Sequence, residues 1–379
     1  MAIQVGRPAA ATGIEFSTSV VLDLVNAMYF TALAEGQEGV DEWPRQTRAR
    51  MDPALRAELD LLFTCPRAEP GIMGALNDTL FFHREAWGDV DALLEFVRAL
   101  PAEGTPNPRE PGIQGLMLYA LRWPGHNEPY ELPRGKRTRD ALVQALAEGA
   151  QEPDCLGQQP TDYDPAAALA LFDDPEGLRA RLLQMIRRFY DEHYRPDEAR
   201  RQASMRRSAE AHQSDLTRDA KDVARLVQGR STSCLETVCL GDYRTYVFVP
   251  SLDVGVYNSC IDYPSLHALY YACEHQYRGA DDDGTVARLA LVYRALADEQ
   301  RLRILRLLRD DELYVQEIVE RTGLHQSVVS RHLSFMKGVG LVNARRENNM
   351  KFFSLNREAG DELRRAVETL LPGTMTPAR

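Results

Sequence analysis

Apolar residues recur every three or four positions along much of the first 200 residues, which is the spacing of an amphipathic helix. Between 18 and 34, Val21, Leu24, Val25 and Met28 fall on one face of such a helix. The same spacing predicts further helices over 53–63, 89–99, 113–122, 138–148 and 175–194. Segments rich in Pro and Gly interrupt this pattern at 101–113, 124–135 and 152–165. The pattern therefore predicts a mainly α N-terminal domain with long loops.

The stretch 196–228 is polar and starts with Pro196, a residue well suited to the first position of a helix. It carries a basic cluster of four arginines, Arg200, Arg201, Arg206 and Arg207. Mixed with Asp and Glu, such a cluster is typical of a solvated helix face with ion pairs four residues apart. A contact between these arginines and phosphate is the alternative.

The pattern changes between 235 and 262, where Tyr, Val and Phe dominate and turn signals occur at Pro250-Ser251 and Asp253–Gly255. These features predict two strands, 243–249 and 254–260, that form a small β-hairpin. A helix is predicted over about 264–276. The Asp- and Gly-rich segment 279–285 then predicts a linker, which divides the chain into an N-terminal domain, 1–280, and a C-terminal domain, 281–379.

Helical spacing returns after the linker, over 285–297, 299–309 and 312–321. Gly323, in the run Thr322-Gly323-Leu324, supplies a tight turn before a fourth helix, 326–338. In this helix Val329, Leu333 and Met336 form an apolar face. The arrangement predicts a helix-turn-helix whose last helix is the recognition helix.

The other face of the predicted recognition helix carries donors, acceptors and a cation that suit base edges and phosphates. These candidate DNA contacts are Gln326, Ser327, Ser330, Arg331 and His332, followed by Lys337 near the end of the helix. Two short predicted strands follow, joined at Asn348-Asn349. Asn tolerates the backbone conformation that a two-residue hairpin turn requires, so the two strands are expected to form a hairpin. This hairpin predicts a DNA-contacting wing that carries Arg345, Arg346, Asn348, Asn349 and Lys351.

Charge distribution supports this assignment although the net charge of the chain is −11. Residues 281–379 hold 16 Lys and Arg against 15 Asp and Glu, whereas the first 280 hold 29 against 41. The acidity therefore belongs to the N-terminal part. Within 325–351 there are five basic side chains and one acidic side chain, which is the local balance expected at a nucleic-acid interface.

The run LHQSVVSRHL, followed by Gly-Leu-Val and the predicted wing, resembles the ArsR/SmtB family of winged-helix regulators over about 285–371. The resemblance implies a homodimer built on the helices 285–297 and 357–371, and a near-palindromic operator in double-stranded DNA. The metal-binding Cys-x-Cys positions of the family are Tyr314 and Gln316 here, and 357–371 contains no His. We therefore expect no metal at the family's sites and no cofactor.

Two other functions remain open from the residues alone. A metal or redox sensor would use Cys234, Cys239, Cys260 and Cys273, with His275, although their spacing is loose for zinc. A protein-interaction scaffold could reuse a winged helix. No nucleotide-binding loop, metalloprotease motif or nucleophile elbow is present, so we expect no catalytic residues.

We expect a cytoplasmic repressor without a membrane partner, since neither a signal peptide nor a membrane-spanning stretch is visible. Its N-terminal domain would dimerise or bind a small-molecule effector. Trp43, Trp87 and Trp123 could line a pocket for such a molecule, but their interpretation as core residues is favoured.

Overall fold

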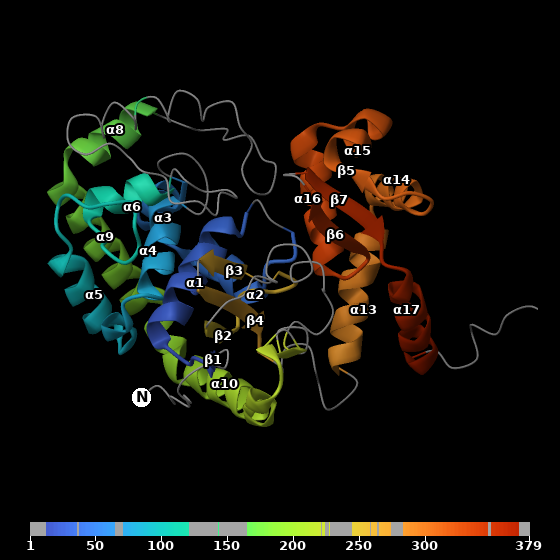
Figure 1. Ribbon diagram of the computed structural model, residues 1–379, viewed down its shortest axis with the longest axis horizontal. Coiled ribbons are helices and arrows are strands. Elements are labelled where there is room, and N and C mark those ends of the chain that lie inside the picture. The colour runs from blue at the N-terminus through green and yellow to red at the C-terminus, as the bar shows by residue number, and fades with distance from the viewer. Residues whose placement is uncertain are drawn as a thin grey trace, which may run out of the picture.

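The fold comes from a computed structural model of the 379-residue chain. It describes residues 13–35, 38–64, 71–120, 165–220, 245–257, 259–263, 265–273, 283–347 and 350–370, together with residues 143, 222, 223 and 227. Two lobes are visible in Figure 1. We call residues 13–273 the N-terminal lobe and residues 283–370 the winged helix.

Helices make up most of the N-terminal lobe, as the periodicity predicts. The predicted helices correspond to α1 (Val20–Leu33), α3 (Pro53–Thr64), α5 (Val90–Ala99), α6 (Ile113–Ala120) and α9 (Pro175–Phe189), and α9 continues into a π-helical turn, Tyr190–Tyr194. Three further helices were not predicted: α2 (Glu42–Arg50), α4 (Gly71–Leu80) and α8 (Pro165–Asp173). The predicted helix 138–148 lies outside the described residues, apart from Val143.

A four-stranded sheet crosses this lobe in the order β1-β2-β4-β3. Its strands are β1 (Gly13–Phe16), β2 (Thr245–Ser251), β3 (Ser259–Tyr263) and β4 (Leu266–Ala272). β2 pairs in parallel with both β1 and β4, while β3 and β4 are antiparallel. One face of β2, with Val247 and Val249, packs into the helical core, and the other, with Tyr246 and Phe248, packs against Phe16 and the segment after α10 (Glu198–Ala211).

The predicted hairpin and the predicted helix 264–276 are both wrong. Strands do occur near 243–249 and 254–260, but β2 and β3 do not pair with each other, since β4 lies between them. β4 occupies most of the predicted helix. Because both faces of the sheet are covered, the sequence of β4, LHALYYA, is apolar almost throughout and lacks the alternation that marks a strand.

Arg201 of α10 is completely buried, although the sequence pattern predicted an exposed arginine cluster. Its Nε donates to Asp23 Oδ2 at 2.7 Å, and its two terminal nitrogens donate to the carboxylate of Asp253. The guanidinium also lies over the rings of Trp43 and Tyr194, at 4.6 and 4.9 Å. Arg200 pairs with Asp197, just before α10, and Arg206 donates to Gln202 within the helix.

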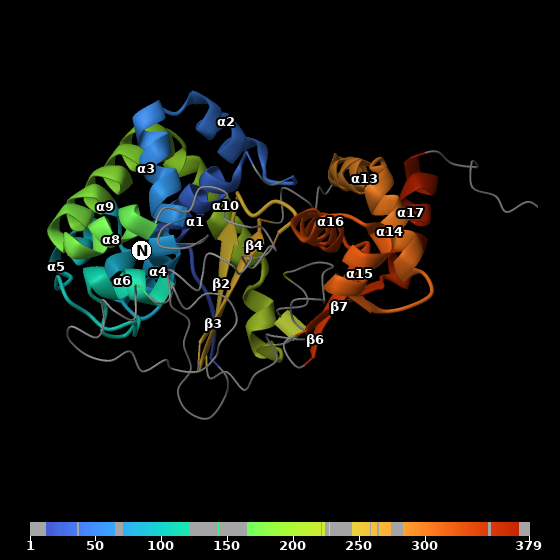
Figure 2. The same cartoon turned by 90° about the horizontal axis from the view of Figure 1, so that it is seen from above.

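The winged helix has a hydrophobic core of its own, formed by residues such as Ile304, Ile318, Val329, Leu333 and Phe353. Its elements are α13 (Asp283–Leu296), α14 (Glu299–Leu308), β5 (Leu313–Tyr314), α15 (Val315–Thr322), α16 (Gln326–Gly338), β6 (Val342–Glu347), β7 (Met350–Leu355) and α17 (Arg357–Leu370). The three strands form a sheet in the order β5-β7-β6. The predicted winged helix-turn-helix is confirmed, and in Figures 1 and 2 its α16 lies next to the N-terminal lobe.

Candidate nucleic-acid interface

The helix-turn-helix is formed by α15 and α16. The backbone N–H of Tyr314 donates to Glu317 at 3.1 Å, which caps the start of α15. Gly323 ends α15 with a φ of +69°, and its N–H donates to Val319 O at 2.9 Å. This left-handed residue is what allows the chain to turn sharply into α16, as the sequence predicted.

The first turn of α16 is capped by a residue that the sequence analysis missed. His325 precedes the helix, and the N–H of Ser327 donates to its Nδ1 at 3.4 Å. The hydroxyl of Ser327 lies 2.8 Å from the same nitrogen. Histidine is not among the preferred capping residues, so composition gave no signal for this role. The cap also occupies the Ser327 hydroxyl that we had predicted to contact DNA.

Three of the predicted groove-facing side chains are available for a partner. Val329, Leu333 and Met336 are buried, as predicted, which turns the opposite face of α16 outward. Arg331 is exposed on that face, Gln326 is exposed at the first position of the helix, and Ser330 is half-buried at the edge of the apolar face. None of these three side chains has a hydrogen bond or an ion pair within the described part of the chain. An amide, a hydroxyl and a guanidinium can together contact base edges and phosphates.

His332 lies in a different environment from these three residues. Burial lowers its pKa below the ordinary value, and the charges that act on it are Asp298, Arg301, Arg331 and Glu38. It therefore faces α14 and a loop of the N-terminal lobe. At neutral pH its ring is uncharged, so it can exchange hydrogen bonds but adds no cation for a phosphate.

The wing brings together some of the predicted basic residues. β6 and β7 pair as far as Glu347 and Met350, so only two residues connect them, and Arg346 stands opposite Lys351 in the register. Lys351 is exposed and its Nζ lies 5.5 Å from the centre of the Phe353 ring. Asn348, Asn349 and the side chain of Arg346 lie outside what the structure describes.

Arg345 is held within the protein. Its Nε donates to Glu312 at 2.7 Å, a second nitrogen lies 2.5 Å from the same carboxylate, and the guanidinium covers the ring of Phe352 at 4.6 Å. A phosphate would have to compete with Glu312 for this cation. Lys337, at the end of α16, is half-buried.

Those residues considered for metal binding that the structure describes do not lie together. Tyr314 packs its ring against Phe352, with 6.1 Å between centroids, and Gln316 is exposed. Cys260 packs at the edge of the sheet's second hydrophobic cluster, whereas the buried Cys273 contacts Met205 and Leu252 in another. Burial raises the pKa of the Cys273 thiol, which disfavours the thiolate that a metal requires. Cys234, Cys239 and His275 lie outside the described residues.

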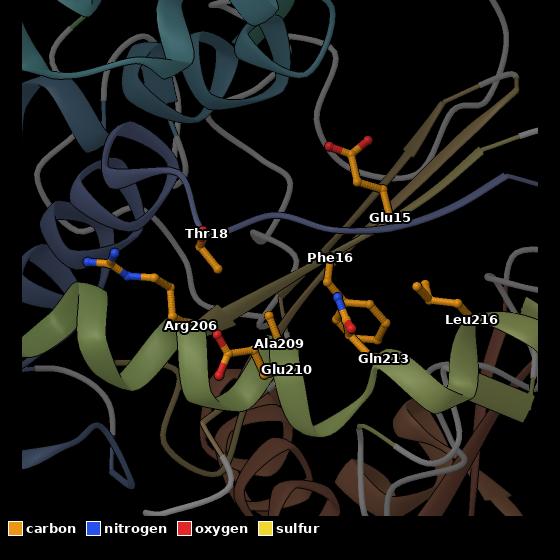
Figure 3. Close-up of a pocket in the computed structure, with 8 residues that line it drawn as sticks. All are labelled: Glu15, Phe16, Thr18, Arg206, Ala209, Glu210, Gln213 and Leu216. Carbon is orange, nitrogen blue, oxygen red and sulfur yellow. The ribbon is translucent and has the colours of Figure 1, made fainter. Parts of the chain in front are cut away.

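A shallow hollow in the N-terminal lobe lies between β1 and α10 (Figure 3). Phe16, Ala209 and Leu216 supply apolar surface, and Glu15 and Arg206 belong to its polar lining. Glu15 is paired with Arg84 at 2.7 Å, and Arg206 donates to Gln202 at 3.1 Å. Of the tryptophans considered for a pocket, Trp87 is a buried core residue that donates to Leu80 O, Trp43 donates to Asp197, and Trp123 lies outside the described residues.

Comparison with known proteins concerns the C-terminal part. A family model described as bacterial regulatory protein, arsR family, matches residues 298–344. The chain is 38% identical to the transcriptional activator HlyU of Vibrio cholerae over 84 residues, which cover 22% of this chain and 75% of HlyU. It is 41% identical to the HTH-type transcriptional regulator CmtR of Mycobacterium bovis over 83 residues, which cover 22% of this chain and 68% of CmtR.

Among solved structures, a homodimeric winged helix-turn-helix DNA-binding domain from Mycobacterium bovis is 28% identical in sequence to this chain. The match covers 27% of this chain and 94% of that domain, and its TM-score is 0.22. No helix among the described residues has both the length and the apolar character needed to cross a membrane.

Proposed function

We propose, because the chain belongs through its C-terminal part to the ArsR family of bacterial regulatory proteins, that it regulates transcription by binding an operator in double-stranded DNA. The observation that carries this proposal is the accessible surface of α16, where the side chains of Gln326, Ser330 and Arg331 have no hydrogen bond or ion pair within the described residues. The family relationship supports a DNA-binding regulator. We further propose that the protein represses transcription and that its operator is near-palindromic. We also propose that a small-molecule effector controls it and that it is cytoplasmic.

Within α16 and the wing, the structure supports a division of labour among the predicted contacts. We propose that Gln326 and Arg331 contact base edges, because the first turns of a recognition helix reach deepest into the major groove. Ser330, Lys337 and Lys351 would contact the DNA backbone. Ser327 and Arg345 contribute less in this proposal, since each already has a protein partner.

The first test measures binding of the full chain to duplex DNA from the region upstream of its own gene, at several salt concentrations. We expect sequence-preferring binding that weakens by about 0.9 log units per log unit of salt for each phosphate contacted. Fluorescence anisotropy, with a random-sequence duplex as the control, measures both properties. Equal affinity for the two duplexes, or an affinity that is insensitive to salt, would contradict the proposal.

We also propose a homodimer, with α13 in its interface. Val286 and Tyr293 of α13 are seven residues apart, so they lie on one face of the helix, and they are 46% and 49% exposed. α13 packs beside α17, the other helix that the family resemblance assigns to the dimer interface. Large apolar side chains on one helix face are what a second copy of the chain would cover.

Replacing Tyr293 with Ser tests the dimer interface. We expect the dissociation constant of the dimer to rise about tenfold, because tyrosine is among the residues that contribute most to protein interfaces. Sedimentation equilibrium of the full chain measures it. Leu302→Ser is the matched control, since Leu302 is 47% exposed but lies on α14. Equal dissociation constants for the two variants would remove α13 from the interface.

A further inference from the structure

Two loops of the N-terminal lobe contact the recognition helix. One contains Glu38 and Gly39, and the other contains Val256 and Tyr257. Val256 and Tyr257 pack against the core of the winged helix, and the Tyr257 hydroxyl donates to the backbone oxygen of Glu38. We call the contact between these two loops and the winged helix the joint.

An ion pair closes one side of the joint. Glu38 accepts from Arg301 of α14 at 3.0 and 3.4 Å, and the Arg301 side chain is only 5% exposed. The guanidinium of Arg301 also lies 4.7 Å from the centre of the Phe335 ring, on α16. Glu38 therefore neutralises a cation that is buried against the recognition helix.

Close backbone approach marks the other side of the joint. A Cβ atom at Gly338, the last residue of α16, would lie 2.9 Å from the backbone oxygen of Val256. A Cβ atom at Gly39 would lie 2.7 Å from the Val256 side chain and 2.8 Å from the Phe335 ring. All three distances are too short for a real Cβ atom, so the loops fit against α16 only because these positions are glycines.

The joint covers the second half of the helix face that we expect to enter DNA. Phe335 and Gly338 follow Arg331 by four and seven residues, so the three residues lie along one stripe of α16. The rise of an α-helix places position 338 about 10 Å from Arg331 along the axis. The major groove is about 12 Å wide and 8.5 Å deep. With Arg331 at the base edges, the Val256 loop would therefore stand where the edge of the groove must lie.

The figures agree with this geometry. In both Figure 1 and Figure 2, α16 lies on the side of the winged helix that faces the N-terminal lobe, and α17 lies on the far side. A duplex that approaches α16 meets the N-terminal lobe.

We infer that the joint is an autoinhibitory contact, in which the N-terminal lobe covers the second half of the recognition helix and must move away before DNA docks fully. The inference rests on the proposed DNA-binding function. Only open molecules bind DNA fully, so the apparent dissociation constant equals that of the open form divided by the fraction of molecules that are open.

Gly338→Ala is the sharpest test, because its new methyl group meets the backbone of Val256 rather than a flexible side chain. Alanine also favours a helix more than glycine does, so α16 itself is not weakened. We expect faster hydrogen exchange at residues 253–257 and about tenfold tighter binding of the full chain to duplex DNA from upstream of its gene. Gly88→Ala, just before α5 in the N-terminal lobe, is the matched control, since its added atom would meet only the Cβ of Ala92, at an ordinary contact distance of 3.7 Å.

Glu38→Gln is a second route to the open form, and it leaves α16 unaltered. It removes the carboxylate of the N-terminal lobe that pairs with Arg301 and leaves only Asp298, at 3.8 Å and within the winged helix, so we expect severalfold tighter DNA binding. Glu42→Gln is its control, because Glu42 is exposed and accepts a hydrogen bond from Gln46. Tighter binding by both variants, with both controls like the wild type, supports the inference.

Two results overturn the inference and leave the proposed function intact: faster exchange with unchanged or weaker DNA binding, and unchanged exchange in both variants. If exchange is faster but neither the variants nor the wild type binds duplex DNA, the proposed function fails, and the inference fails with it.

Discussion

We expect Arg201→Met to lower the free energy of unfolding of the N-terminal lobe by about 3–5 kcal/mol, because it strands two buried carboxylates without their cation. Asp23 and Asp253 are both fully buried, and Arg201 donates to each of them. Burial raises the pKa of Asp253 to about 6, and Arg201 opposes that rise. Without Arg201, ionised Asp253 would lose its compensating charge as well as two hydrogen bonds.

Urea denaturation of the full chain, followed by circular dichroism, measures this loss. Arg200→Met is the control, because Arg200 is the neighbouring residue, its side chain is 57% exposed, and it pairs with Asp197 at the surface. The triple variant Asp23→Asn, Arg201→Met, Asp253→Asn separates charge from packing. We expect it to recover much of the lost stability, since removing a whole buried ion cluster is far less destabilising than removing one partner. A triple variant as unstable as Arg201→Met would show that packing of the guanidinium against Trp43 and Tyr194 dominates.

Arg201 also shows why the sequence predicted the helices of the N-terminal lobe but not the way they pack. The spacing of apolar residues predicted α3, α5 and α9, because each buries one stripe of its own surface, and it predicted α1 and α6, which are buried on nearly every side. Arg201 belongs to a helix whose neighbouring residues are polar, so its pattern predicted an exposed face. Its partners come from α1 and from the loop after β2, and no local pattern announces contacts over such separations.

The sheet was mispredicted for a related reason. β2 pairs in parallel with β1, whose residues lie more than two hundred positions earlier in the chain, and with β4. Local signals favour hairpins between consecutive strands, whereas parallel pairing depends on distant partners. Because both faces of the sheet are buried, β4 lacks the alternation of apolar and polar residues that would have distinguished its sequence from that of a helix.

The candidate DNA interface was easier to predict, because most of its geometry is local. The apolar face of α16 and the turn at Gly323 together determine which way Gln326, Ser330 and Arg331 face. The prediction omitted the groups that come from elsewhere. His332 lies near Glu38 of the N-terminal lobe, and Arg345 is bound by Glu312. The place of these two residues in the helix and the wing could not predict such partners, because the partners come from other parts of the chain.

Arg331→Ala is the second change for which we expect a large effect, a loss of about 1–3 kcal/mol in operator binding. Arg331 is the exposed cation on the outward face of α16, and it has no ion pair within the described residues. A guanidinium in the major groove can donate two parallel hydrogen bonds to guanine, which a truncated side chain cannot replace. The loss corresponds to a dissociation constant raised about 5- to 150-fold, measurable by anisotropy with the full chain.

Arg331→Lys and Arg303→Ala make this experiment decisive. Lysine keeps the charge but not the planar pair of donors, so we expect Arg331→Lys to retain the salt dependence while losing discrimination between operator and random DNA. Arg303 is exposed on α14 and paired with Glu299, so Arg303→Ala removes one positive charge away from the proposed groove face. If Arg331→Lys binds the operator like the wild type while Arg331→Ala reduces the salt slope by about 1, Arg331 contacts a phosphate and the base contacts belong to Gln326. If Arg331→Ala behaves like Arg303→Ala, the outward face of α16 is not the surface that contacts DNA.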